Sequence, residues 1–347
     1  MPLDAEPERR VPARKGPVDL LRVEGLKTYF FTRHGVAKAV DGVDFTLAKG
    51  ERLGLVGESG SGKSVTALSI MRLVRDPPGR IVAGRIVLEG QDLLALDDER
   101  MRRVRGRRVS MIFQDPINHL DPIMKVGDWI AEALTLHSGM SRGAALAEAV
   151  RILKVLKVPS PEDVLHAYPF QLSGGMCQRV LIATAIATQP ALLIADEATS
   201  ALDVTVQASI LRTLTELTDT LGMAVLLTTH NMLVVRKACT RVMVMYAGRV
   251  VESCATDQLF ENPMHPYTVG LLNSVPALER LGQALEPMAG EPPLPTDDMP
   301  GCAFYARCPN RADVCLGRRP PLQEVRPAHW SACHFPELAQ RKRDAAG

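Results

Sequence analysis

The chain has 347 residues, of which 46% are hydrophobic, 23% charged and only 4% aromatic. At about 150 residues per domain, this length predicts one large and one small domain with an aliphatic core, and the composition excludes disordered, collagen-like and coiled-coil chains. There are 41 Lys and Arg residues and 39 Asp and Glu residues, so the net charge is only +2, which excludes a global attraction to nucleic acid. No apolar run reaches the ~18 residues that a membrane span needs.

Short aliphatic runs alternate with helical segments after a Pro-rich start. Residues 1–18 predict a flexible leader, and their lack of an apolar stretch is untypical of a signal peptide, so we expect a cytosolic protein. The alternation is typical of an α/β protein with a parallel sheet, whose expected strands are 20–23, 40–47, 52–56, 109–113, 192–195, 224–227 and 242–245. Between residues 115 and 172 apolar residues recur at helical spacing, which predicts a helical subdomain.

A glycine-rich loop follows the expected strand 52–56. Residues 57–64, G-E-S-G-S-G-K-S, match G-x-x-x-x-G-K-[ST], in which backbone N–H groups surround phosphate oxygens. Lys63 suits the β and γ phosphates, and the Ser64 hydroxyl suits Mg²⁺. The alternative is a chance turn between strand and helix. The candidate nucleotide-binding residues are Gly57, Ser59, Gly60, Ser61, Gly62, Lys63, Ser64 and Val65.

Two carboxylates end the apolar run 192–195. A carboxylate at the end of a buried strand can hold the Mg²⁺ shell, and the next residue can polarise a water aimed at the γ-phosphate. We therefore assign Asp196 to the metal and Glu197 to the base. The alternative is a solvated acidic turn, which is typical of an isolated Asp-Glu pair.

A serine and two glycines open another helical stretch, in L-S-G-G-M-C-Q-R over residues 172–179, which suits a second phosphate. This run resembles the signature motif of ATP-binding cassette (ABC) ATPases. The resemblance extends to Gln114 in V-S-M-I-F-Q-D-P, to Asp203 in S-A-L-D and to His230 in T-T-H. The family has a glutamine, an aspartate loop and a catalytic histidine at these places.

The resemblance implies that two such domains dock head to tail, with each ATP held between the phosphate loop of one chain and the signature motif of the other. The signature residues acting in trans would be Ser173, Gly174, Gly175 and Gln178. It also implies catalytic roles for Gln114, Glu197 and His230, with Gln114 contributing to the Mg²⁺ site together with Ser64 and Asp196. An early aromatic residue stacks on adenine in the family. Phe30 aligns best and Tyr29 is adjacent, packing within the sheet being the alternative.

Stretches 57–59, 111–116, 201–208 and 265–268 narrow the resemblance to the ATPase subunits of bacterial dipeptide and oligopeptide importers, whose relatives serve nickel complexes and glutathione. It covers residues 19–335 and implies a nucleotide-binding domain over 19–262, with the helical subdomain at 115–172, and a C-terminal extension over 263–347. The implied partners are a second ATPase subunit, expected to be a paralogue, two membrane permease subunits and an extracytoplasmic peptide-binding protein, with no nucleic acid. The implied location is the cytoplasmic face of the inner membrane, as a peripheral subunit.

Four of the seven cysteines lie in the last 46 residues, where they suit a metal more than disulfides. Their gaps of five, six and 17 residues match neither a ferredoxin run nor a zinc knuckle, so spacing leaves the metal open. The resemblance favours one [4Fe–4S] cluster. Zinc, with His329 or His334, and free structural cysteines are the alternatives. The candidate ligands are Cys302, Cys308, Cys315 and Cys333, whereas Cys177, Cys239 and Cys254 are expected to be buried hydrophobes.

The leading interpretation is an ATP-hydrolysing motor of a peptide importer. A soluble ABC ATPase acting on nucleic acid or ribosomes is the main alternative, although such proteins usually carry two cassettes or a long coiled-coil insertion. A nucleotide-sensing regulator is disfavoured by the intact Glu197 and His230. Six arginines within residues 100–108 are typical of a solvated face, with lipid head groups, a partner or nucleic acid as alternatives.

Overall fold

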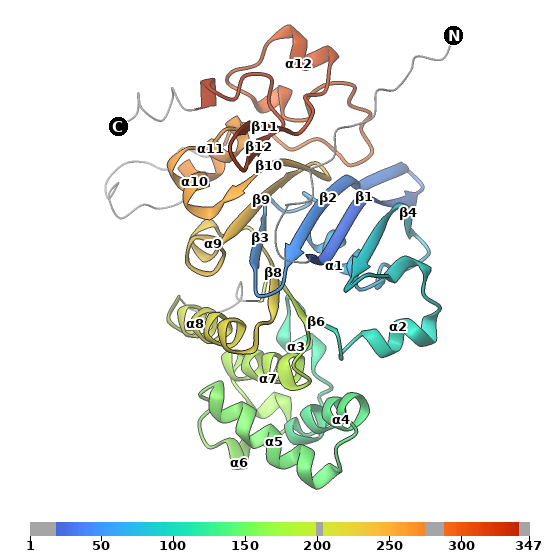
Figure 1. Ribbon diagram of the computed structural model, residues 1–347, viewed down its shortest axis with the longest axis vertical. Coiled ribbons are helices and arrows are strands. Elements are labelled where there is room, and N and C mark those ends of the chain that lie inside the picture. Colours follow the sequence, from blue (N-terminus) through green and yellow to red (C-terminus); the bar gives the residue numbers. More distant parts are fainter. Residues whose placement is uncertain (1–18, 199–203, 275–287, 340–347) are drawn as a thin grey trace.

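Two sheets and a group of helices build the computed structural model, which describes residues 19–198, 204–274 and 288–339 (Figure 1). The larger sheet has the strand order β11-β12-β10-β9-β3-β8-β7-β6, and the smaller has the order β2-β1-β4-β5. The predicted leader 1–18 and Asp203 lie outside the described residues. The strand bounds are β1 Asp19–Thr32, β2 Gly35–Ala48, β3 Arg52–Val56, β4 Gly79–Leu88, β5 Gln91–Asp92, β6 Val109–Ile112, β7 Leu192–Asp196, β8 Ala224–Thr229, β9 Arg241–Tyr246, β10 Arg249–Ala255, β11 Gln323–Arg326 and β12 His329–Ser331.

The parallel part of the larger sheet is β9-β3-β8-β7-β6. Its strands are apolar runs with both faces covered, as expected for a parallel sheet between helices. The five expected strands from 52–56 onward form this part, which confirms the predicted α/β class. Since all five run in the same direction, their carboxyl ends meet at one edge of the sheet.

The first two expected strands belong to the smaller, antiparallel sheet instead. β1 and β2 form a hairpin and are longer than predicted, and β1 also pairs with β4. Burial alternates along β2, as it does in a strand with one covered face. The sequence reading missed β4, because its glycines and arginines interrupt the apolar pattern.

The helices that were expected between residues 115 and 172 are present, and α7 continues this group to residue 187 (Figure 1). Ile130, Leu134, Leu153 and Ile182 are almost fully buried where α4, α5 and α7 pack together. The helix bounds are α1 Lys63–Ile70, α2 Asp98–Val104, α3 Pro116–His119, α4 Val126–Ser138, α5 Arg142–Val155, α6 Pro161–Val164, α7 Gly174–Ala187, α8 Val204–Leu221, α9 Met232–Ala238, α10 Thr256–Glu261, α11 Pro266–Asn273 and α12 Asp313–Gly317. Within the described ranges no helix is both long and apolar enough to cross a bilayer.

The C-terminal residues complete the larger sheet rather than standing apart from it. β12 pairs with β10, with Glu252 opposite Ser331, and β11 pairs with β12. The fully buried Glu252 and His329 meet across this junction, where Oε1 and Nε2 lie 2.7 Å apart. The carbonyl oxygen of Pro295, within the extension, accepts a backbone hydrogen bond of 2.8 Å from Lys38 in β2. The extension is therefore docked against both sheets.

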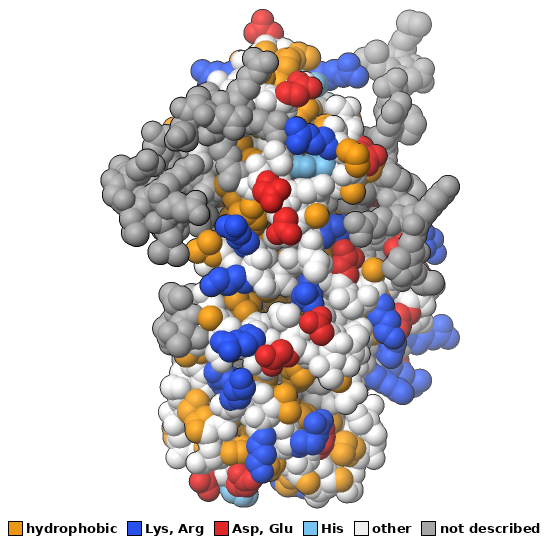
Figure 2. Space-filling model, turned by 60° about the vertical axis from the view of Figure 1, so that its left-hand side comes forward, with side chains coloured by type: hydrophobic (Ala, Val, Ile, Leu, Met, Phe, Trp, Pro, Cys, Tyr) orange, Lys and Arg blue, Asp and Glu red, His pale blue; other side chains and the backbone are white. Residues whose placement is uncertain are grey.

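Charges of both signs are interspersed over the described part of the face in Figure 2. The arginine run 100–108 fits this pattern, because Arg100 pairs with Asp97, Arg103 with Glu99 and Arg108 with Glu89. Five of its six arginines are exposed, which agrees with the leading interpretation as a solvated face. Arg105 is the exception: it is half-buried and donates to the carbonyl oxygens of Met71 and Arg72.

Candidate functional site

The glycine-rich loop connects β3 to α1. Gly62 precedes the helix with a φ of 106°, and a Cβ there would lie 2.4 Å from the carbonyl oxygen of Ala39. Only glycine combines this conformation with this close approach. Ser59 and Gly60 are exposed at the rim of the loop, whereas Ser61 and Lys63 are buried. The loop thus exposes backbone at the positive end of a helix, where anions bind favourably.

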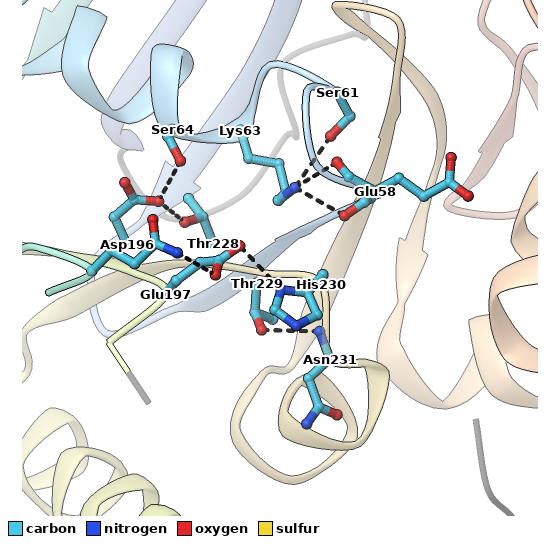
Figure 3. A network of polar contacts seen from close by, with 12 residues as sticks. Glu58, Ser61, Lys63, Ser64, Asp196, Glu197, Thr228, Thr229, His230 and Asn231 are labelled. Carbon is cyan, nitrogen blue, oxygen red and sulfur yellow. Dashed lines mark hydrogen bonds and ion pairs between the residues drawn. The ribbon is translucent and has the colours of Figure 1, made fainter. Parts of the chain in front are cut away.

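Lys63 lies inside this loop (Figure 3). Its Nζ donates hydrogen bonds of 2.9 Å to the carbonyl oxygens of Gly57 and Glu58 and one of 3.3 Å to Ser61 Oγ. Burial lowers the pKa of its ammonium group, and the charges of Glu197 and Asp196 act in the opposite direction. A phosphate would give the ammonium group the close negative charge that the carbonyl oxygens only partly supply.

Asp196 ends β7 beside the first turn of α1. Its Oδ1 accepts hydrogen bonds from Ser64 Oγ, at 2.9 Å, and from Thr228 Oγ1 (Figure 3). The carboxylate is 6% exposed, and burial raises its pKa, although the two hydroxyl groups partly offset this. A buried carboxylate and a serine hydroxyl in contact are the hard oxygen donors that Mg²⁺ prefers, so this pair fits the metal.

Glu197 is held in a left-handed conformation, with a φ of 46°, directly after β7. Its backbone N–H donates to the Thr228 carbonyl oxygen at 3.0 Å. Gln114 Nε2 donates to its Oε2 at 3.0 Å, and His230 Nδ1 lies 3.1 Å from its Oε1. Since Gln114 follows β6, Glu197 follows β7 and His230 follows β8, three neighbouring strands deliver these side chains to one edge of the sheet. Figure 3 shows the contact between Glu197 and His230. The structure brings the three candidate catalytic residues together, and places the Gln114 amide against Glu197.

The signature residues lie elsewhere, at the start of α7 among the helices, well away from α1 (Figure 1). Ser173 caps the helix by accepting from the Met176 N–H at 3.4 Å, and Ser173 and Gly174 are exposed. Gln178 differs: it is 1% exposed, and no described residue accepts a hydrogen bond from its Nε2. In the described part of this chain, no hydrogen bond or ion pair links these residues to the phosphate loop.

The two candidate adenine-stacking aromatics are both engaged in the smaller sheet. Tyr29 Oη donates to Asp41 Oδ1 at 2.7 Å, and burial together with this hydrogen bond raises the pKa of Tyr29 to about 12. Phe30 is packed so closely on Gly79 that a Cβ on this glycine would lie 2.7 Å from its ring.

The four C-terminal cysteines surround one small pocket, together with Pro320 and His334. Burial raises the pKa of Cys302 to about 11 and that of Cys333 to about 12, and the neighbouring thiols add to both shifts. Four thiols around one pocket fit a thiophilic metal centre, whose binding would release their protons. His329 does not line this pocket and is bound to Glu252 instead. Cys177 and Cys239 are buried among apolar side chains, as expected. Cys254 is buried too, but its Sγ lies within 4.8 Å of a Glu252 carboxylate oxygen and a His329 ring nitrogen.

Sequence reasoning gave no role to Thr228, although it lies in the recognised T-T-H run and donates to Asp196. It also overlooked Glu58, Tyr267 and Arg307. Tyr267 and Arg307 lie far along the chain from the phosphate loop, yet both contact Glu58. The side chain of Glu58 occupies a variable position of the loop pattern, so the motif gave no signal for it.

Comparison with known proteins extends these observations. Residues 40–200 match the family model described as ABC transporter, and residues 251–315 match that described as oligopeptide/dipeptide transporter, C-terminal region. The oligopeptide transport ATP-binding protein AppD of Bacillus subtilis is 46% identical over 87% of this chain and 92% of its own length. The dipeptide transport ATP-binding protein DppD of the same organism is 47% identical over 88% of this chain and 91% of its own length.

The chain belongs to the ATP-binding subunits of oligopeptide and dipeptide ABC transporters. Among solved structures, this ABC subunit resembles the ATP-binding cassette MJ0796, determined as a dimer in a post-hydrolysis state with ADP and Pi. The two share 25% identity and a TM-score of 0.62, over 68% of this chain and 98% of the other. The predicted family and ABC-type fold are confirmed.

Proposed function

We propose that this protein hydrolyses ATP to power the import of di- or oligopeptides across the cytoplasmic membrane, as a peripheral subunit on its cytoplasmic face. One observation carries the ATPase assignment: Lys63, the Ser64–Asp196 pair and the Glu197 cluster converge at the carboxyl edge of the parallel sheet. The relatives named for oligopeptide and dipeptide transport support the peptide substrate. Nickel complexes and glutathione remain alternative solutes.

The site residues divide the work of phosphoryl transfer. Lys63 and the loop N–H groups bind the β and γ phosphates, and Ser64, Asp196 and Gln114 hold Mg²⁺. When bound, Mg²⁺ neutralises charge that develops on the phosphate oxygens. Glu197 accepts a proton from the attacking water, and its contacts with Gln114 and His230 orient the carboxylate for this task.

A second ATPase subunit completes the site in this proposal. The exposed N-terminus of α7 offers Ser173, Gly174 and Gly175 to the γ-phosphate on the facing chain, and Asp203 belongs to the same interface. Gln178 joins them only after its buried side chain turns outward. The triphosphate charge then attracts both chains, so that binding closes the dimer and hydrolysis opens it. Two permease subunits and an extracytoplasmic peptide-binding protein complete the transporter.

Residues 263–347 form the extension of this ATPase, attached to a nucleotide-binding domain over 19–262. We assign a [4Fe–4S] cluster to the pocket formed by Cys302, Cys308, Cys315 and Cys333, since all four cysteines line it. Zinc is the alternative. Iron and acid-labile sulfide, measured after anaerobic purification, should each approach four per chain. Stoichiometric zinc without sulfide would reject the cluster.

The transport function is tested by reconstitution. ATPase activity should rise when the protein is assembled with its permease pair in vesicles, and rise further with a peptide-loaded binding protein. Stimulation by RNA or DNA in place of the permeases would instead support the soluble ATPase. The Glu197→Gln variant serves as the control for contaminating ATPases, because it should remain inactive in both settings.

A further inference from the structure

The C-terminal extension contacts the phosphate loop directly, at Glu58. In Figure 3 the Glu58 side chain points away from Lys63. Arg307 meets it there with two parallel hydrogen bonds: Nη1 to Oε2 at 2.7 Å and Nη2 to Oε1 at 2.9 Å. The Arg307 side chain is only 4% exposed. Bidentate arginine–carboxylate pairs combine charge with fixed geometry, and they are screened less when they are shielded from water.

A second contact reaches the backbone of the same residue. The Glu58 N–H donates to Tyr267 Oη at 2.8 Å, and Tyr267, on α11, is fully buried. This hydroxyl therefore fixes the peptide group between Gly57 and Glu58, whose carbonyl oxygen, that of Gly57, accepts from Lys63 Nζ at 2.9 Å. The Glu58 carbonyl oxygen accepts from the same Nζ, also at 2.9 Å. The side chain and the backbone of one loop residue are thus held by two separate segments of the extension.

The two anchors are themselves rigidly supported. The rings of Tyr246 and Tyr267 lie with centroids 4.6 Å apart, and Phe304 packs edge-on to Tyr246 at 5.3 Å. The Arg307 guanidinium lies 5.9 Å from the centroids of Tyr246 and Phe304, and its Nε donates to the Ala289 carbonyl oxygen at 3.2 Å. An arginine held on aromatic rings loses little conformational freedom when it binds a carboxylate.

We propose that Arg307 and Tyr267 are positioning residues for ATP binding: through Glu58 they hold the phosphate loop in the conformation that accepts the triphosphate. Neither residue lies at the reacting atoms, so they act through the loop. Without them, Glu58 and the carbonyl group beside Lys63 are free to move, and ATP must order the loop as it binds. The extension thereby sets the affinity of a site to which it contributes no ligand. The inference rests on the ATPase activity and is independent of the solute and of any metal.

The test compares Arg307→Ala and Arg307→Lys in the full-length protein. We expect Arg307→Ala to raise the KM for ATP and the Kd of a non-hydrolysable ATP analogue about tenfold, while kcat changes less than threefold. Arg307→Lys should give an intermediate shift, because an ammonium group replaces only part of the bidentate contact. Arg311→Ala is the matched control: this arginine binds the Ala306 carbonyl group and stacks on Tyr305 within the extension, and its KM should equal the wild type.

Substitutions on the loop side separate positioning from a merely structural role. If Arg307 acts through Glu58, then Glu58→Ala should raise the KM similarly, and the double variant should be no worse than Arg307→Ala alone. Tyr267→Phe, which lacks the acceptor oxygen, gives a further readout should Arg307→Ala not fold. A lowered kcat at unchanged KM in all these variants would mean only a smaller folded fraction, and would overturn the proposal. Failure of the wild type to bind ATP would instead reject the ATPase assignment.

Discussion

Replacing Glu197 with glutamine removes the proposed base and keeps the shape of the side chain. In the wild type, one carboxylate oxygen accepts from Gln114 and the other contacts His230 Nδ1, at 3.0 and 3.1 Å. An amide keeps one acceptor oxygen for Gln114, and its NH2 group can donate to His230 Nδ1 when the ring proton is on Nε2. Gln114 is exposed and the His230 side chain is 55% exposed, so water satisfies any group that the amide leaves unpaired. The folding cost should stay below about 1 kcal/mol.

The catalytic cost should be far larger. A positioned general base contributes about 10²- to 10⁴-fold, which corresponds to about 3–5 kcal/mol of activation free energy. Single-turnover release of phosphate from Mg·ATP should slow by this factor in Glu197→Gln, while a fluorescent ATP analogue binds with wild-type affinity. Glu99→Gln makes the same chemical change on the exposed face of α2 and should keep full activity. Turnover of Glu197→Gln within twofold of the wild type would refute the assignment of the base.

Three further predictions follow from the buried groups. Burial raises the pKa of Asp196 in the folded protein above its pKa in the unfolded chain. Ionisation of Asp196 therefore lowers the stability of the folded state as the pH rises from the unfolded pKa through the folded pKa. Asp196→Asn should therefore raise the Tm of the nucleotide-free protein at pH 8, with an effect that shrinks as the pH falls toward the ordinary Asp pKa of 3.8, while abolishing Mg²⁺-dependent hydrolysis; a lower Tm at pH 8 would contradict this. His329→Ala removes the 2.7 Å contact of the buried Glu252, whose Oε1 then keeps the hydrogen bond from the Met264 N–H, and should destabilise the protein by about 1–3 kcal/mol in thermal unfolding, whereas the exposed His34→Ala should not. Gly62→Ala should abolish ATP binding with little loss of helicity by circular dichroism, since its Cβ would lie 2.4 Å from the Ala39 carbonyl oxygen; retained binding would show that the loop relaxes.

Much of the nucleotide site could be read from the sequence because its parts are local. A strand, a tight glycine turn and a helix N-terminus are contiguous in residues 52–70, so their pattern is visible without knowledge of the fold. The same holds for Asp196 and Glu197 at the end of β7. The meeting of Gln114, Glu197 and His230 could be expected too, because each follows a strand of one parallel sheet.

The contacts that hold the phosphate loop could not be predicted from any local sequence pattern. Glu58 and Arg307 are 249 residues apart, and an arginine carries no local signal of which carboxylate it will meet. Gln178 shows the opposite case: its motif predicts a nucleotide contact on a second chain, yet packing of α7 buries its side chain. Likewise, nothing local in 79–88 identified a strand of the smaller sheet.

The sequence by itself determined the chemistry of this protein, since phosphate, metal and base residues must occupy fixed positions relative to the turns that present them. Only the tertiary structure decided that β11 and β12 join the catalytic sheet and that the extension binds Glu58 of the phosphate loop. The physical reason is that these contacts join segments far apart in the chain, and their partners are selected by the packing of the whole core.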